Sequence, residues 1–167
     1  MDDWPSAFST GSPFWTDIAA PLAALDSSRF PAADDLNRLL PAGLCNEAGL
    51  PIQFVSADTL PGVPYEEHIH ATGQVSTRAD NWHDLFNAMM WVCYPKLKSA
   101  MNAMHHEAMP RSSPEGRGRL RDALTLFDEC GVIFSSSDQE LLAALARRDW
   151  ATVFGHPASA GSVSIVG

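Results

Sequence analysis

The chain has 167 residues, of which 46% are hydrophobic and 19% are charged, and this length and composition fit one globular domain and exclude wholesale disorder. Twenty acidic residues outnumber eleven Lys and Arg residues, and the formal net charge of −9 disfavours non-specific binding to nucleic acid. No apolar run approaches the roughly 18 residues of a membrane helix, and three widely spaced cysteines predict reduced thiols in a cytoplasmic protein.

Short elements are expected in the first half of the chain. Apolar residues spaced by three and four predict an amphipathic helix from Phe14 to Leu25, and Ala32–Leu40 predicts a second short helix. The run Ile52–Val55 is typical of a brief strand. Between Tyr65 and Thr72 apolar and polar residues alternate, which predicts a half-exposed strand that ends at Gly73.

A helix pair follows. Asp80 or Asn81 is suited to cap a helix whose apolar face is formed by every third or fourth residue from Trp82 to Cys93. Pro95 stands where a second helix begins, and that helix is expected to end near Pro110. The connection between the two helices is short, so they are expected to pack as neighbours.

The next elements are predicted to be a β-hairpin and a helix. The runs Leu124–Phe127 and Val132–Ser135 flank the turn Asp128–Gly131, in which glycine supplies a positive φ. Ser137 and Glu140 have the spacing of a capping box, which predicts a helix that ends at Arg147 and Arg148.

The sequence therefore predicts an α+β fold, a mostly helical single domain over residues 1–156 with a helix pair, a β-hairpin and one or two further short strands. Residues 157–167 are mostly small, show no period and are predicted to form a flexible C-terminal tail. Deleting this tail should change the melting temperature little, unless Val163–Val166 pairs as an edge strand.

A segment in the middle of the chain resembles the signature of the bacterial domain of unknown function 3025 family. The segment is the run from Thr77 to Ala88, TRADNWHDLFNA. The likeness continues over about Tyr65 to His156 at Pro95, Lys96, Asn102, His105, the run from Arg121 to Gly131, Ser136, Ser137, Asp138, Leu141 and Leu142. The resemblance implies a bacterial protein and no particular reaction. Members that resemble this chain continue after His156 with apolar sequence, so the tail is expected to be atypical or truncated.

Polar residues gather on the helix pair and are the candidate functional residues. Helical spacing places His83, Asp84 and Asn87 opposite the apolar stripe of the first helix, and Asn102, His105 and His106 lie away from the methionines of the second. If the helices pack, the two polar stripes face one another. Imidazole with carboxylate can bind a divalent metal ion or act as a general base with an orienting partner.

We therefore take His83, Asp84 and His105 as the first candidates for catalysis and for metal binding, with Asp122, Asp128 and Glu129 as weaker metal ligands. A divalent metal ion is the only cofactor that these residues suggest. His68 and His70 are a weaker pair that would share one face of the predicted strand. The structural alternative for the first candidates is a helix start stabilised by Asn81 or Asp84, with His105 bonded to the backbone.

Two functions from different classes follow from these residues. One is a metal-assisted or acid/base enzyme of the hydrolase type that acts on a small polar substrate. The other is a non-catalytic interaction or scaffold domain in which the same residues hold the fold together. The substrate, the partners and the oligomeric state have no signal in the sequence.

Overall fold

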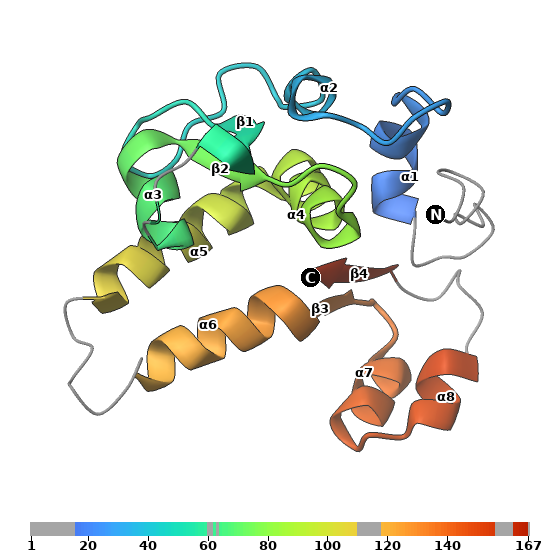
Figure 1. Ribbon diagram of the computed structural model, residues 1–167. Coiled ribbons are helices and arrows are strands. Elements are labelled where there is room, and N and C mark those ends of the chain that lie inside the picture. Colours follow the sequence, from blue (N-terminus) through green and yellow to red (C-terminus); the bar gives the residue numbers. More distant parts are fainter. Residues whose placement is uncertain (1–15, 60–61, 63, 110–117, 156–161, 167) are drawn as a thin grey trace.

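Helices and two small sheets make up the chain, which confirms the predicted α+β class (Figure 1). The computed structural model describes residues 16–59, 62, 64–109, 118–155 and 162–166. Within them the elements are, in chain order, α1 (Thr16–Ala23), α2 (Ala33–Asn37), β1 (Gln53–Ser56), the 3-10 helix η2 (Ala57–Thr59), α3 (Tyr65–Thr72), β2 (Gln74–Thr77), α4 (Trp82–Cys93), α5 (Pro95–Ala108), α6 (Arg119–Cys130), β3 (Gly131–Ser135), α7 (Gln139–Ala146), α8 (Trp150–Gly155) and β4 (Ser162–Val166).

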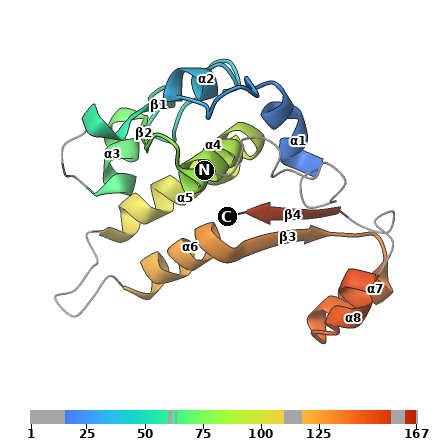
Figure 2. The same ribbon diagram turned by 45° about the vertical axis from the view of Figure 1, so that its right-hand side comes forward.

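The helix pair α4 and α5 is the centre of the fold. In Figures 1 and 2 the elements α2, β1, β2 and α3 lie on one side of this pair, and α6, β3 and β4 lie on the other. The main core forms around α4, where Leu85, Met89 and Trp91 are at most 1% exposed. Burying a large apolar side chain contributes about 1.5–3 kcal/mol, so α4 is the helix whose burial stabilises the fold most.

Both ends of α4 agree with the sequence prediction. The Asn81 side chain caps the helix, because its Oδ1 accepts a hydrogen bond from the Asp84 backbone N–H at 3.0 Å. Pro95 then opens α5 at a first-turn position, where a missing N–H leaves no hydrogen bond unmade.

The first sheet consists of β1 and β2, which pair in parallel from Gln53 opposite Gln74 to Ser56 opposite Thr77. Parallel neighbours need a crossover connection, and α3 is part of it. The predicted strand over Tyr65–Thr72 is therefore wrong, because these residues form α3. Ile69 is 1% exposed and joins the core. It is the one buried residue in the two turns of α3, so the alternation of apolar and polar residues in the sequence did not indicate a strand.

Charge and glycine placement favour a helix in the same segment. Glu66 and Glu67 occupy the first turn of α3, where carboxylates interact well with the helix dipole. Gly73 ends the helix with a φ of 75°, the left-handed conformation that glycine adopts at low cost.

The second sheet corrects the predicted hairpin. Residues Leu124–Phe127 belong to α6, which continues through Asp128 and Glu129 to Cys130. Strand β3 pairs antiparallel with β4, so its partner is Ser162–Val166 and not Leu124–Phe127. Gly131 has a φ of −70°, so it does not supply the predicted positive φ. It lets the chain pass close to Phe127, because an added Cβ would collide with the backbone and ring of that residue.

The residues after β3 differ from the prediction in two details. Asp138, not Ser137, caps α7, because its Oδ1 accepts hydrogen bonds from the N–H groups of Glu140 at 2.9 Å and Leu141 at 3.2 Å. The tail was predicted to be flexible unless Val163–Val166 paired as a strand, and Ser162–Val166 does form β4, which pairs with β3. Residues 156–161 lie outside the described residues.

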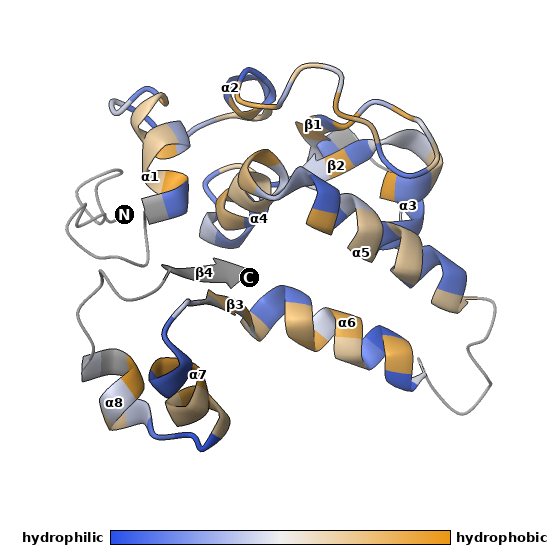
Figure 3. Ribbon diagram, turned by 180° about the vertical axis from the view of Figure 1, so that it is seen from behind, coloured by the Kyte–Doolittle hydropathy of each residue, from blue (hydrophilic) through white to orange (hydrophobic). Residues whose placement is uncertain are grey.

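Figure 3 shows that α5 and α6 carry hydrophilic and hydrophobic residues along their whole length, as amphipathic helices do. The two helices also pack against each other. Among the described residues, none of the helices combines the length and the apolar character that crossing a bilayer requires.

Candidate functional site

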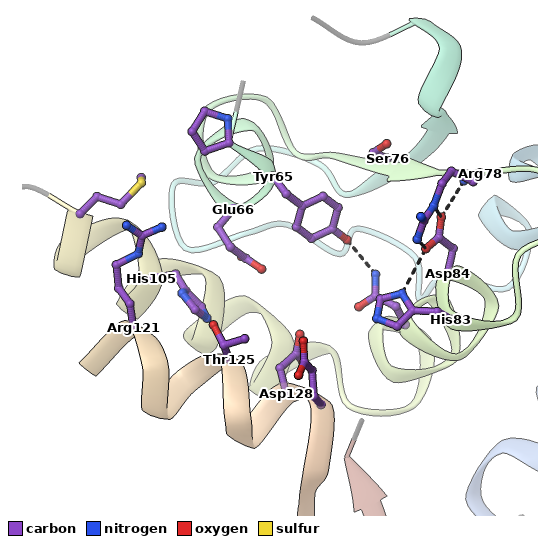
Figure 4. A pocket seen from close by; sticks show the side chains of 14 residues that line it. Tyr65, Glu66, Ser76, Arg78, His83, Asp84, His105, Arg121, Thr125 and Asp128 are labelled. Atoms are coloured by element: carbon purple, nitrogen blue, oxygen red, sulfur yellow. Dashed lines mark hydrogen bonds and ion pairs between the residues drawn. The ribbon is translucent and has the colours of Figure 1, made fainter. Parts of the chain in front are cut away.

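A pocket of about 560 Å³ opens where α3, β2, α4, α5 and α6 meet (Figure 4). Twelve of its fourteen lining residues have polar side chains, and they come from parts of the sequence that are far apart. The lining residues are Pro64, Tyr65, Glu66, Ser76, Arg78, His83, Asp84, Asn87, His105, Met109, Arg121, Thr125, Asp128 and Glu129.

Asp84 is the anchor of one wall of the pocket. Its Oδ2 accepts hydrogen bonds from the backbone N–H of Arg78 at 2.8 Å and from Arg78 Nε at 2.9 Å, and its Oδ1 accepts one from Arg78 Nη2 at 2.7 Å. This fork-shaped ion pair is among the strongest side-chain contacts. It ties the residue that follows β2 to the first turn of α4.

The same carboxylate orients His83. The Nδ1 atom of His83 lies 3.2 Å from Asp84 Oδ1, while the His83 side chain is 74% exposed. Burial raises the pKa of Asp84, but the hydrogen bonds from Arg78 and His83 outweigh burial, so the net pKa is lowered and the carboxylate stays charged. The arrangement is an imidazole held by a buried anion, with its other ring nitrogen, Nε2, left for a ligand.

Tyr65 presents a hydroxyl to the pocket from the first turn of α3. Asn87 Nδ2 donates a hydrogen bond to the Tyr65 hydroxyl oxygen at 2.7 Å, which leaves the phenolic hydrogen for another acceptor. Tyr65 as a whole is 39% exposed, but its hydroxyl end lies among other side chains. Desolvation of this hydroxyl, and then the Glu66 carboxylate, raise the pKa of Tyr65, so the group stays protonated at neutral pH.

His105 lies on the wall opposite His83 and is only 5% exposed. Burial lowers the pKa of His105, the carboxylates of Glu66 and Asp128 oppose this effect, and the net direction is downward. A neutral imidazole follows at neutral pH, with one N–H donor and one acceptor nitrogen.

Glu66 stands next to His105 and is held by a buried residue of α5. Asn102 Nδ2 donates hydrogen bonds to the Glu66 backbone oxygen at 2.8 Å and to Glu66 Oε2 at 2.7 Å. Asn102 is 2% exposed. This contact fixes the start of α3 on α5 and aims the Glu66 side chain at the pocket.

A buried lysine pairs with one carboxylate of the pocket lining. Lys98 Nζ donates to Asp128 Oδ1 at 2.6 Å, and the Lys98 side chain is 6% exposed. The pair joins α5 to α6. Asp128, a weaker candidate from the sequence, therefore has a structural partner.

The structure brings most of the predicted residues together. His83, Asp84, His105, Asp128 and Glu129 all line the pocket, whereas Asp122 is exposed and does not. His106 is not in the pocket but stacks on His70 with ring centroids 3.7 Å apart. Because His68 and His70 are on a helix, they share no face, and His68 lies 3.2 Å from Gln74 through Nε2 and Oε1.

Metal binding by these residues stays a prediction. Within the described parts of the chain, no group of three or more His, Cys, Asp or Glu side chains is arranged to hold a metal ion. The oxygens of Asp84 are engaged by Arg78 instead.

Four charged or aromatic residues of the pocket had no functional interpretation in the sequence. Tyr65 and Glu66 were assigned to a strand, so their place at the start of a helix beside α5 was missed. Arg78 was noted only as part of the family signature. Arg121 was noted only in the run that resembles the family, while helix spacing from Asp128 and Thr125 places it on the pocket face of α6.

A sequence profile of a known family matches this chain over residues 52–161, which includes every lining residue of the pocket. The family carries the description "Protein of unknown function (DUF3025)". Neither the curated proteins nor the solved structures contain a match. The matched segment covers more than half of the chain and the predicted resemblance is confirmed: the protein belongs to the DUF3025 family.

Proposed function

We propose that the pocket is the active site of an acid/base enzyme of the hydrolase type that acts on a small polar substrate. The observation that carries the proposal is the convergence of His83, held by Asp84, with His105 across one pocket. Two imidazoles of different burial on facing walls suit a reaction in which one moves a proton and the other binds the substrate.

His83 is the general base in this proposal. If Nδ1 carries its proton toward Asp84, Nε2 is free to accept a proton from a water molecule. The Asp84 carboxylate then stabilises the imidazolium that forms. The activated water attacks an electrophilic carbon or phosphorus of the substrate, the bond from that atom to the leaving group breaks, and the His83 imidazolium returns its proton to the leaving group.

Tyr65 and His105 have supporting roles. The Tyr65 hydroxyl, which accepts from Asn87, donates its hydrogen toward the oxygen on which negative charge develops. Neutral His105 binds the substrate from the other side with one donor and one acceptor nitrogen.

The first prediction concerns His83→Gln. A panel of nitrophenyl esters, phosphodiesters and glycosides and of small amides is assayed with the parent chain, and the substrate with turnover is carried forward. His83→Gln should lower kcat/KM by about 100-fold or more, which is the usual contribution of general base catalysis. His68→Gln is the matched control, because His68 also contacts a neighbouring side chain but lies outside the pocket. Equal activity of both variants would contradict the role of His83.

A scaffold role is the second candidate function, and one observation favours it. The bonds from Arg78 to Asp84 join the end of β2 to α4, which is a structural role in itself. In that case Asp84→Ala lowers the free energy of unfolding by about 1–3 kcal/mol, and the parent chain turns over no substrate of the panel. Urea unfolding of the variant beside the activity panel separates the two functions.

A further inference from the structure

The inner end of the pocket continues into a narrow recess between α3, α5 and α6. Tyr65, Glu66, His105 and Asp128 border both the pocket and the recess. The recess is closed behind them by Ile69, Trp91, Lys98, Met101 and Asn102. The polar side chains at its mouth therefore face a ligand that has entered the pocket.

Asn102 presents a buried acceptor in this recess. Its Nδ2 is fixed by the two hydrogen bonds to Glu66, so the amide has one orientation and Oδ1 is its remaining polar atom. This oxygen is buried and has no hydrogen-bond partner among the described residues, while Asn102 is 2% exposed. Buried polar atoms are nearly always hydrogen-bonded, so the oxygen is open to a donor that a ligand supplies.

The carboxylates at the mouth offer further acceptors. Glu66 gives Oε2 to Asn102 and Asp128 gives Oδ1 to Lys98, which leaves one oxygen of each for a ligand. Within the described part of the chain, no Lys or Arg forms an ion pair with Glu66, whereas Asp84 and Asp128 each have one. Of the two carboxylates that border the recess, Glu66 is therefore the one whose charge a ligand can balance.

The charges around the pocket and recess leave an excess of one negative charge when the histidines are neutral. The carboxylates are Glu66, Asp84, Asp128 and Glu129, and the cations are Arg78, Arg121 and Lys98. A ligand with one positive charge balances this set, and a carboxylate or phosphate ligand does not.

We propose that the mouth of the recess binds a primary ammonium group of the ligand through the Glu66 carboxylate and the Asn102 carbonyl. The substrate class is then a small polar amine. This inference rests on the proposed function in taking the pocket as the ligand site. An ammonium group has three donors and no acceptor, which matches the free oxygens of Glu66, Asp128 and Asn102. A divalent metal ion fits less well, because the Lys98 ammonium already lies on Asp128.

Binding of the amine should also change the surroundings of the Trp91 indole. The recess has no room for a water-sized sphere, so an amine that reaches Asn102 has to widen it. The Trp91 Nε1 atom is buried without a hydrogen-bond partner among the described residues and lies in a side chain that lines the recess. Its indole N–H signal is therefore a local reporter of binding.

The test is a nuclear magnetic resonance titration of the full chain with n-butylammonium chloride. Sodium butyrate and n-butanol at the same ionic strength serve as anionic and neutral probes, and magnesium chloride tests a metal. We expect saturable shifts of the Trp91 indole and Asn102 side-chain amide signals with the amine alone. Glu66→Gln should weaken amine binding by about tenfold, because it removes a charge-assisted hydrogen bond.

Glu67→Gln is the matched control, since Glu67 lies in the same helical turn, is exposed and does not line the pocket. It should leave amine affinity within about twofold of the parent chain, because an exposed charge is well screened. Melting curves confirm that both variants are folded, and the amide oxygen that Glu66→Gln introduces still accepts a hydrogen bond from Asn102. The proposal is overturned by equal shifts with butyrate, by tighter binding of magnesium, or by equal weakening in both variants.

The experiments distinguish failure of the amine subsite from failure of the proposed enzymatic function. Loss of the His83 effect on activity with intact amine binding would remove the proposed function and leave the subsite. Turnover that depends on His83 without amine binding would keep the enzyme and remove the amine as its substrate class.

Discussion

Asp128 illustrates how a residue that was considered as a metal ligand is expected to stabilise the fold. It neutralises Lys98, whose side chain is 6% exposed. Asp128→Asn leaves the lysine buried without a counter-charge, and breaking a buried pair in this way costs about 3–5 kcal/mol. We expect the free energy of unfolding in urea to fall by roughly 3 kcal/mol.

Asp122→Asn is the control on the same helix, because Asp122 is exposed and lines neither the pocket nor the recess. Its cost should stay below about 1 kcal/mol, the usual value of a helix-dipole contact. If both variants are equally stable, the Lys98–Asp128 pair contributes no net stability.

The sequence predicted those site residues whose neighbours are on the same helix. His83 and Asp84 follow a capping Asn81 in a strongly periodic helix, so their side of α4 could be read from spacing alone. Glu66 and Arg78 reach the pocket only through tertiary contacts, with Asn102 and with Asp84. The spacing of residues along one helix or strand does not show which residues of other elements they contact.

At the scale of elements, Gly73 is the local feature that favours a helix over a strand in α3, because it ends the helix in the left-handed conformation. A side chain there would need a φ of 75° and would collide with the carbonyl of Pro51. Gly73→Ala should therefore lower the free energy of unfolding by about 2 kcal/mol or more, because strain from the left-handed conformation alone costs roughly 1–2 kcal/mol.

Gly49→Ala separates the two causes. Gly49 has a φ of 79°, but nothing lies within 4 Å of an added Cβ. It should lose only the conformational part, roughly 1–2 kcal/mol, in the same urea experiment. A Gly73→Ala variant no less stable than Gly49→Ala would show that the contact with Pro51 relaxes at no cost.

Both wrong element assignments have one physical origin. The period of Tyr65–Thr72 and the apolar run of Leu124–Phe127 are short, and short runs cannot distinguish a strand from one buried helix face. Leu124 is 8% exposed while Leu126 is 64% exposed, so the run has a buried side and a solvent side. The longer helices α4 and α5 were predicted because their periods extend over three turns or more.

For the molecule as a whole, β4 makes the tail part of the fold. Its five residues pair with β3 from Ser162 opposite Ser135 to Val166 opposite Gly131. Removing residues 162–167 leaves the inner edge of β3 without its ladder, and each lost hydrogen bond contributes about 1 kcal/mol. The melting temperature should fall by about 5 °C or more.

Removal of Gly167 alone is the control and should leave the melting temperature unchanged, because the β3–β4 register ends at Val166. Differential scanning calorimetry of both truncated chains measures the effect. A full truncation that melts with the parent chain would mean that the β3–β4 pairing adds no stability.

The position of helix α3 in the chain bears on when the pocket forms during folding. The helix lies in the crossover between β1 and β2, and the Glu66–Asn102 contact spans 36 residues while Lys98–Asp128 spans 30. Helices form within microseconds, whereas contacts between distant residues and parallel pairing are slow because the chain must close long loops first. An early intermediate with α4 and α5 formed would already carry His83 and His105, yet it would have no amine subsite. Ligand binding should therefore be acquired in the last step of folding.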